Sequence, residues 1–133
     1  MQPKTTSVPE LPSLNRLAGR RIVVTGAGSG IGAAISQLFI SEGAKVVALD
    51  RNEAGSLAWM KSGEGIALSM DVSDETQVKD AVHRAAQAME GIDGLVNAAG
   101  IANQDLLSEV SLEDWRRVID VNLTGSFLMA RAC

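Results

Sequence analysis

The chain has 133 residues, of which 46% are hydrophobic and 21% charged, which fits one globular domain rather than a disordered segment. The net charge of -4 argues against a nucleic-acid partner, because such a surface needs clustered positive charge. Apolar runs stay well below the roughly 20 residues of a membrane helix, so we expect no membrane partner. The single cysteine excludes an internal disulfide framework and a cysteine-rich zinc site, and it favours a reducing, cytoplasmic location.

The beginning of the chain differs in composition from the rest. Residues 1–18 contain all three prolines, no periodic apolar face and no apolar centre of a secretory signal. We therefore expect a flexible N-terminal tail over 1–18 and a folded domain over 19–133.

In the expected domain, short apolar runs alternate with segments of helical periodicity. Continuous apolar runs are typical of strands covered on both faces, and they occupy residues 21–25, 45–50, 66–70 and 94–97. The helical segments between and after them cover residues 31–39, 53–61, 74–89 and 111–133. This alternation predicts an α/β fold whose parallel strands are joined by right-handed crossovers.

Two of the helical segments have clear apolar stripes. The first consists of Ile31, Ala34, Ile35, Leu38 and Phe39, and Gly43 follows as a natural end. The second consists of Val78, Ala81, Val82, Ala85, Ala86 and Met89. Asp74 and Gln77 form a capping box before this second stripe, and Gly91 ends it.

A glycine-rich turn follows the first expected strand, with the sequence Thr25-Gly26-Ala27-Gly28-Ser29-Gly30-Ile31-Gly32. Glycine permits a tight turn with positive φ and lets a diphosphate approach bare backbone, while the helix N-terminus attracts its negative charge. This strand–turn–helix setting favours a dinucleotide site. Its residues would be Gly26, Gly28, Ser29, Gly30, Ile31 and Gly32; the alternative is a structural turn in another α/β fold.

Asp50 lies at the end of the second expected strand, where a carboxylate can accept hydrogen bonds from both ribose hydroxyls of an adenosine. The same charge repels a 2′-phosphate, so we expect NAD rather than NADP. Arg51 keeps NADP open, because a guanidinium binds a 2′-phosphate or stacks on adenine. Asp50 could also be an ordinary polar residue at the start of a loop.

Several ordered motifs together resemble the classical short-chain dehydrogenase/reductase family from Gly19 to Cys133. They are the glycine-rich turn, Asp71-Val72, Asn97-Ala98-Ala99-Gly100, Ser111-Leu112-Glu113-Asp114-Trp115 and Asp120-Val121-Asn122-Leu123-Thr124-Gly125. The resemblance implies a Rossmann-type doubly wound parallel sheet with strand order 3-2-1-4. It also implies hydride transfer between a nicotinamide dinucleotide and a small alcohol or carbonyl substrate.

The resemblance assigns further cofactor contacts. Asp71 would bond the adenine amino group with the Val72 backbone alongside, although Asp71 could equally be an acid at a helix start. The segment after the fourth strand would line the cofactor ribose and tie the central strands together. It comprises Asn97, Ala98, Ala99 and Gly100, with Ala98 where many members have asparagine.

Asn122 falls on one helical line with Trp115, Ile119 and Ser126, and we expect that line to be buried. A buried amide without a partner costs roughly 1–3 kcal/mol, so a polar partner is expected. By resemblance, Asn122 is the catalytic asparagine that holds a water of the proton relay. The alternative is an asparagine satisfied by neighbouring backbone.

The family's chemistry also needs a tyrosine, a lysine four residues later and a serine, but the sequence contains no tyrosine. We therefore expect a partial Rossmann domain that is inactive by itself. The fourth strand would be an edge, and the apolar last helix predicts a homo-oligomer. The main hypothesis is the dinucleotide-binding half of an NAD-dependent oxidoreductase. The alternatives are a non-catalytic nucleotide-binding pseudoenzyme and a module that completes its sheet with another chain.

Overall fold

The computed structural model describes residues 12–133, in which helices and strands alternate as expected. Their order is β1 (Arg21–Thr25), α1 (Gly30–Ser41), β2 (Lys45–Asp50), α2 (Glu53–Trp59), β3 (Ile66–Ser69), α3 (Glu75–Met89), β4 (Gly94–Asn97), α4 (Leu112–Ile119), the π-helical turn η1 (Asp120–Thr124) and α5 (Gly125–Ala132). The strands form one parallel sheet in the order β3-β2-β1-β4, which confirms the expected doubly wound fold. None of the helices in the described part is both long and apolar enough to span a membrane.

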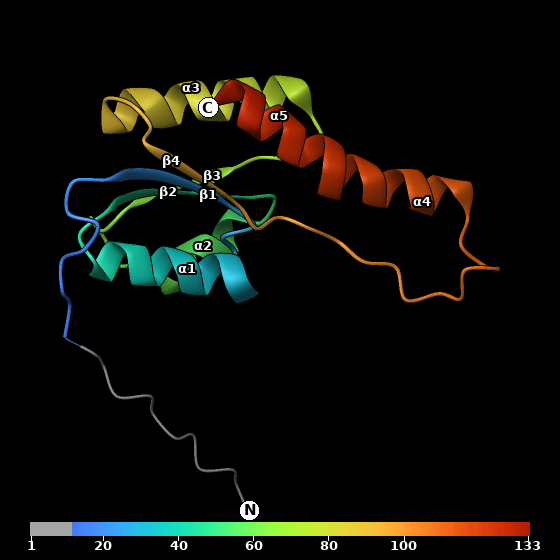
Figure 1. The fold of residues 1–133 in the computed structure, drawn as a ribbon, viewed down its shortest axis with the longest axis horizontal. Helices are drawn as coiled ribbons and strands as arrows, with labels where there is room; N and C mark the ends of the chain where they lie inside the picture. Colours follow the sequence, from blue (N-terminus) through green and yellow to red (C-terminus); the bar gives the residue numbers. More distant parts are fainter. Residues whose placement is uncertain (1–11) are drawn as a thin grey trace, which may run out of the picture.

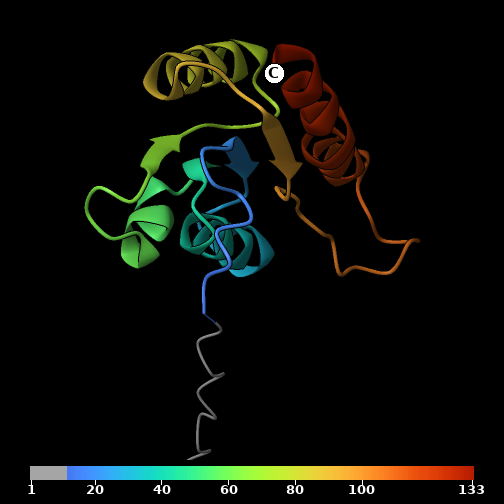
Figure 2. The same cartoon turned by 60° about the vertical axis from the view of Figure 1, so that its left-hand side comes forward.

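The sheet lies between two helical layers (Figure 1). Helices α1 and α2 cover one face, and α3 and α5 cover the other, as the turned view in Figure 2 also shows. Neighbouring strand residues point to opposite faces, so Val23 joins the core under α3 and Val24 joins the core under α1. Because both cores are apolar, the strand sequences are apolar throughout rather than alternating.

Helix α3 confirms its predicted ends and face. The Asp74 carboxylate accepts hydrogen bonds from the backbone amides of Thr76 and Gln77. At the other end, Glu90 adopts a left-handed conformation with φ of 62°, and Gly91 follows. Within the predicted stripe, Val78, Ala81, Val82, Ala85 and Met89 are buried.

The expected apolar face of α1 is wrong in detail. The helix faces the sheet with the small residues Gly32, Ala33 and Ser36, whereas Leu38 is 50% and Ile31 75% exposed. The reason is the close approach of α1 to the turn before it, because a Cβ on Gly32 would collide with the Gly26 carbonyl. Small side chains therefore face the sheet near the start of α1, whereas Phe39 and Ile40 near its end pack against the core.

The described domain includes part of the expected tail. Residues 1–11 of that tail lie outside the described residues, but Arg16 and Leu17 are bonded to the C-terminal end of α1. The Arg16 guanidinium lies 2.8 Å from the buried Glu42 carboxylate, and the Leu17 amide donates to the Glu42 carbonyl at 2.9 Å. This ion pair holds the pKa of Glu42 below its ordinary value. Residues before Gly19 therefore contribute contacts to the described fold.

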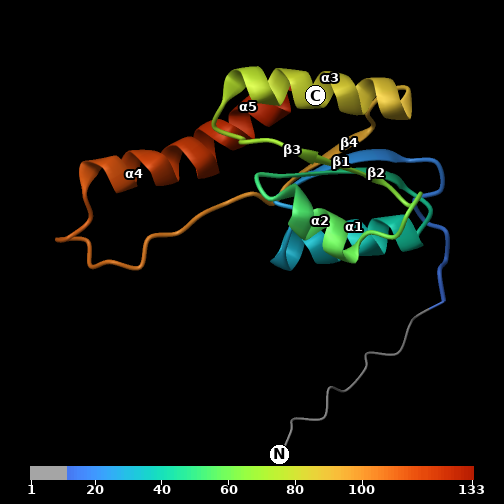
Figure 3. The ribbon, with the colours of Figure 1, turned by 180° about the vertical axis from the view of Figure 1, so that it is seen from behind.

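The single long helix expected after Ser111 is divided by η1 into α4 and α5. Helix α5 lies on the sheet, with Leu128 and Met129 buried, whereas α4 has no buried residue and projects beyond the sheet (Figure 3). The expected buried line is therefore wrong at Trp115, which is 54% exposed, and at Asn122, which is also exposed. Two causes are visible: no sheet lies beneath α4, and the π-helical turn interrupts the α-helical spacing at Asn122.

Candidate functional site

A cleft of about 380 Å³ opens at the carboxyl ends of the strands, where the chain leaves β1 and β4 toward opposite faces of the sheet. It brings together most residues of the predicted cofactor site: Gly26, Ser29, Gly30, Ile31, Gly32, Asp50, Arg51, Asp71, Val72, Ala98, Ala99 and Gly100. The predicted Gly28 and Asn97 do not line it. Apolar walls that the sequence analysis did not assign come from Leu49, Met70, Ile101 and Val121.

The glycine-rich turn forms the floor beside α1. Gly26 has φ of 65°, and a Cβ there would lie 2.7 Å from the Ala98 carbonyl carbon, so both conformation and space require glycine. Ser29 is the N-cap of α1, and its side chain makes no capping hydrogen bond within the described structure. The first amides of α1 therefore remain available to an anion.

Asp50 turns its carboxylate toward this turn. Oδ2 accepts the Gly28 amide at 2.9 Å, and Oδ1 accepts the Asn52 amide at 2.8 Å. A Cβ on Gly28 would lie 2.7 Å from the Asp50 Cγ, so glycine is needed for the carboxylate to reach this position. An ionised carboxylate accepts about four hydrogen bonds, which leaves capacity for two more donors from the cleft.

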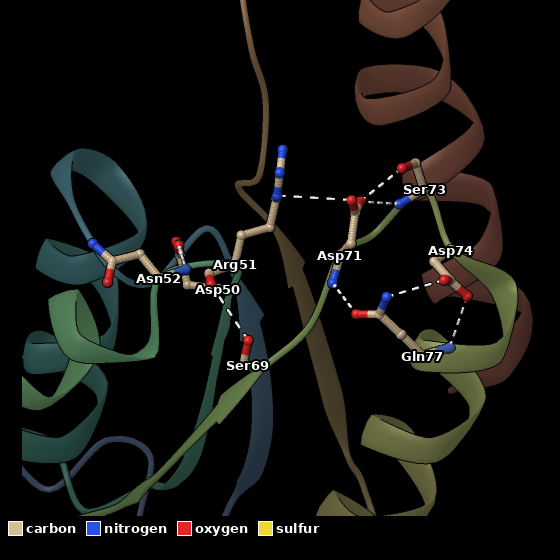
Figure 4. A network of polar contacts seen from close by, with 8 residues as sticks. All are labelled: Asp50, Arg51, Asn52, Ser69, Asp71, Ser73, Asp74 and Gln77. Atoms are coloured by element: carbon tan, nitrogen blue, oxygen red, sulfur yellow. Dashed lines mark hydrogen bonds and ion pairs between the residues drawn. The ribbon is translucent and has the colours of Figure 1, made fainter.

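Asp71 and Arg51 face each other from the ends of neighbouring strands (Figure 4). Asp71 accepts the amide and the hydroxyl of Ser73 at 2.9 and 2.6 Å, and its Oδ2 lies 3.7 Å from the Arg51 Nε. The Ser73 hydroxyl and amide, together with the Arg51 guanidinium, lower the pKa of Asp71. Its carboxylate is therefore an ionised acceptor at the cleft wall, while Asp74 caps α3.

Thr25 joins the turn to the segment after β4. Its Oγ1 accepts the amides of Ala98 and Ala99, each at 3.2 Å, and donates to the Val96 carbonyl at 3.4 Å. The two sides of the cleft are thus fixed to each other. Sequence patterns alone did not predict this role of Thr25, although a hydroxyl at the end of a buried strand indicates a hydrogen-bonding partner.

Asn122 and Asn97 both bond backbone near the cleft. The Asn122 side chain donates to the Ile101 carbonyl and accepts the Ile101 amide, each at 2.8 Å. Asn97 donates to the Ser126 carbonyl at 3.4 Å, which ties β4 to α5. Asn122 therefore satisfies its side-chain amide through backbone groups, which was the alternative to a catalytic asparagine.

Comparison with known protein families matches residues 20–133 to the short chain dehydrogenase family. The chain belongs to the short-chain dehydrogenase family. An uncharacterized oxidoreductase of Thermotoga maritima is 41% identical over 88% of this chain and 48% of that protein. D-threitol dehydrogenase of Mycolicibacterium smegmatis is 41% identical over 88% of this chain and 47% of that enzyme.

Solved structures of the family have the same fold. A 3-ketoacyl-(acyl-carrier-protein) reductase from Brucella melitensis, complexed with NADH, matches 86% of this chain with a TM-score of 0.83 and 36% identity. A short chain dehydrogenase from Burkholderia cenocepacia, in complex with NADP, matches 88% with a TM-score of 0.82 and 34% identity. These matches cover 48% and 50% of the two neighbours. The chain spans about half the length of the curated relatives it matches.

Proposed function

We propose that the cleft binds a nicotinamide dinucleotide and that these residues form the dinucleotide-binding half of an NAD-dependent oxidoreductase. The observation that supports this most strongly is the convergence of the glycine-rich turn, Asp50 and Asp71 on one cleft. The complexes of two structural neighbours with NADH and NADP support the same ligand class. The residues fit such a ligand, because Gly30 lines the cleft and a Cβ there would meet nothing within 4 Å, so the turn presents bare backbone beside open space.

Each polar group of the cleft has a part in this proposal. The amides at the start of α1 bind the diphosphate, the Asp50 carboxylate accepts the adenosine ribose hydroxyls, and Asp71 accepts the adenine amino group. The backbone of Val72 and the segment Ala98–Gly100 border the adenine and ribose, while Asn97 ties β4 to α5. When bound, the nicotinamide ring supplies the hydride acceptor or donor for an alcohol or carbonyl substrate.

The charge at the adenosine end favours NAD over NADP. Asp50 and Asp71 supply two carboxylates there, and Arg51, 3.7 Å from Asp71, supplies one guanidinium. The net charge of these three side chains is negative, so a 2′-phosphate is repelled. Isothermal titration of the chain should give a dissociation constant in the millimolar range or below for NAD and ADP-ribose, and weaker binding of NADP. Absence of any NAD or ADP-ribose binding would overturn the proposed function.

The reaction requires a proton-transferring tyrosine that is not among the 133 residues. We propose that Asn122 serves the reaction side of the site, where its side chain orients the segment that begins at Ile101. A second candidate function is a nucleotide-binding module without chemistry, which would use the adenosine end of the cleft alone. Asn122 is compatible with both candidates, because its side-chain amide holds the backbone of Ile101.

We also propose that the chain forms a homo-oligomer in the cytoplasm. Large apolar side chains are more than half exposed on α4, η1 and α5: Leu112, Trp115, Leu123 and Phe127. Strand β4 is paired on one side only, with β1, so its other edge can accept a strand. A second copy of the chain offers the same apolar surface, as a two-fold interface requires. The single cysteine fits a reducing compartment.

A further inference from the structure

We propose that Trp59 is a positioning residue of the cleft, which fixes one peptide plane of the glycine-rich turn and through it the ribose-binding carboxylate of Asp50. Trp59 is the last residue of α2 and does not line the cleft. The inference deepens the dinucleotide site and rests on the proposed function for its effect on binding.

The geometry begins with the peptide unit between Ala27 and Gly28. The Trp59 indole Nε1 donates a hydrogen bond of 2.8 Å to the Ala27 carbonyl. The amide at the other end of the same unit, that of Gly28, donates to the Asp50 Oδ2 at 2.9 Å. Because a peptide unit is planar and rigid, these two bonds act on one plane from opposite ends.

Helix α2 is also bonded to the other oxygen of the same carboxylate. Asn52, its N-cap, donates its amide to the Asp50 Oδ1 at 2.8 Å. The hydrogen bonds thus form a closed circuit from Asp50 through the turn to Trp59, along α2 to Asn52 and back to Asp50. A carboxylate held at both oxygens has one orientation, and the Trp59 bond is the part of the circuit contributed by a side chain outside the cleft.

The packing of α2 against the turn makes this contact specific. A Cβ on Gly55 would lie 2.6 Å from the Gly28 carbonyl oxygen, so the helix touches the turn backbone directly. The indole is half-buried and also packs on the core under α1. Without the indole N–H, the Ala27 carbonyl loses its partner, and rotation of the plane turns the Gly28 amide away from Asp50.

The substitution Trp59→Phe tests this, because phenylalanine keeps an aromatic ring in the core and removes the donor. Loss of one hydrogen bond that orients the site should weaken ADP-ribose binding about five- to tenfold in isothermal titration. Trp115→Phe is the matched control, since Trp115 lies on α4 away from the cleft. The ADP-ribose affinity of this control variant should equal that of the unchanged chain.

Amide hydrogen exchange separates positioning from general stability and needs no ligand. In Trp59→Phe, the Gly28 amide should exchange faster while the Val23 amide, in the centre of β1, keeps its rate. Equal acceleration at both amides would show a merely structural role and overturn the inference. So would unchanged exchange at Gly28, or ADP-ribose affinity equal to that of Trp115→Phe. If the unchanged chain fails to bind ADP-ribose, the proposed function fails, and the exchange rates still decide whether Trp59 fixes the turn.

Discussion

Asn122 pairs with Ile101 through two hydrogen bonds of 2.8 Å, in which one side-chain amide satisfies both the carbonyl and the amide of a single residue. The pairing joins the π-helical turn η1 to the segment that follows β4. The Asn122 side chain supplies the two hydrogen bonds that the Ile101 backbone would otherwise make to another backbone segment. It thereby fixes the end of the cleft that Ile101 lines.

Removal of this pairing should loosen the segment after β4. We expect Asn122→Ala to lower the free energy of unfolding by about 1–2 kcal/mol, because two backbone groups lose their partners. Urea denaturation measures this, and limited proteolysis should show faster cleavage between residues 101 and 111. Gln104→Ala, in the same exposed segment, is the control and should leave both measurements unchanged. Equal stability of the two variants would contradict a structural role for the pairing.

The charge of Asp50 should decide both affinity and cofactor choice. Asp50→Ala removes a charged acceptor, so we expect NAD binding to weaken about 10- to 100-fold and the preference for NAD over NADP to fall. Asp105→Ala removes an aspartate from the exposed loop after β4 and is the matched control. Titration calorimetry with both dinucleotides measures these effects. Retained NAD affinity in Asp50→Ala would remove Asp50 from the ribose site.

Stability should fall in acid through Asp93, at the amino ends of the strands. The Arg21 side chain and amide hold the pKa of Asp93 well below its ordinary value of 3.8, with 2.7 Å between the closest charged atoms. A depressed pKa in the folded state stabilises the fold above pH 3.8, and this contribution is lost as the pH falls. Denaturation measures the free energy of unfolding at about pH 5 and about pH 2. Its decrease between these two pH values should be smaller in Arg21→Met than in the unchanged chain.

The control for this ion pair is Arg84→Met, which breaks the exposed pair of Arg84 with Asp80 on α3. Its acid-induced loss of stability should equal that of the unchanged chain, because an exposed pair along one helix contributes little. ADP-ribose affinity at neutral pH should be the same in both arginine variants, since neither residue lines the cleft.

Turnover should be undetectable in a polypeptide of these 133 residues, even where it binds NAD. The sequence offers no tyrosine to exchange a proton with the substrate oxygen. The measurement is NADH formation at 340 nm with a panel of small alcohols, with a full-length short-chain dehydrogenase as positive control. Turnover by the purified chain would show that another side chain transfers the proton.

Association should depend on the apolar surface of η1 and α5. Leu123 is 63% exposed, so Leu123→Glu should cost the isolated fold little and should lower the molar mass in light scattering. Leu38→Glu introduces the same charge at a half-exposed leucine of α1 and should leave the mass unchanged. A monomeric unchanged chain, or equal masses of the two variants, would contradict the homo-oligomer.

Local sequence patterns were sufficient to predict the positions of the strands and of α3. The apolar runs at β1, β2 and β4 match the observed strands, and β3 ends one residue earlier than expected. These features follow from residues next to one another in sequence. The strand order needed the family resemblance, since periodicity does not say which strands are neighbours.

The features that were missed depend on contacts between distant parts of the chain. The bond of Trp59 to Ala27 spans 32 positions, and the Thr25 bonds to Ala98 and Ala99 span more than twice as many. The exposure of Trp115 depends on where the sheet ends, which helical periodicity does not encode. The buried face of α1 was missed because close packing there favours small residues over apolar ones.

The hydroxyl of Thr25 has a mechanical consequence. Since it anchors the first residues after β4 to the end of β1, the two inner borders of the cleft move together or not at all. The outer border differs, because the Arg51 side chain that lines it is 64% exposed and rotates about its own bonds. Rotation of an exposed side chain takes nanoseconds or less, so this outer border can change shape without a slow rearrangement of the backbone.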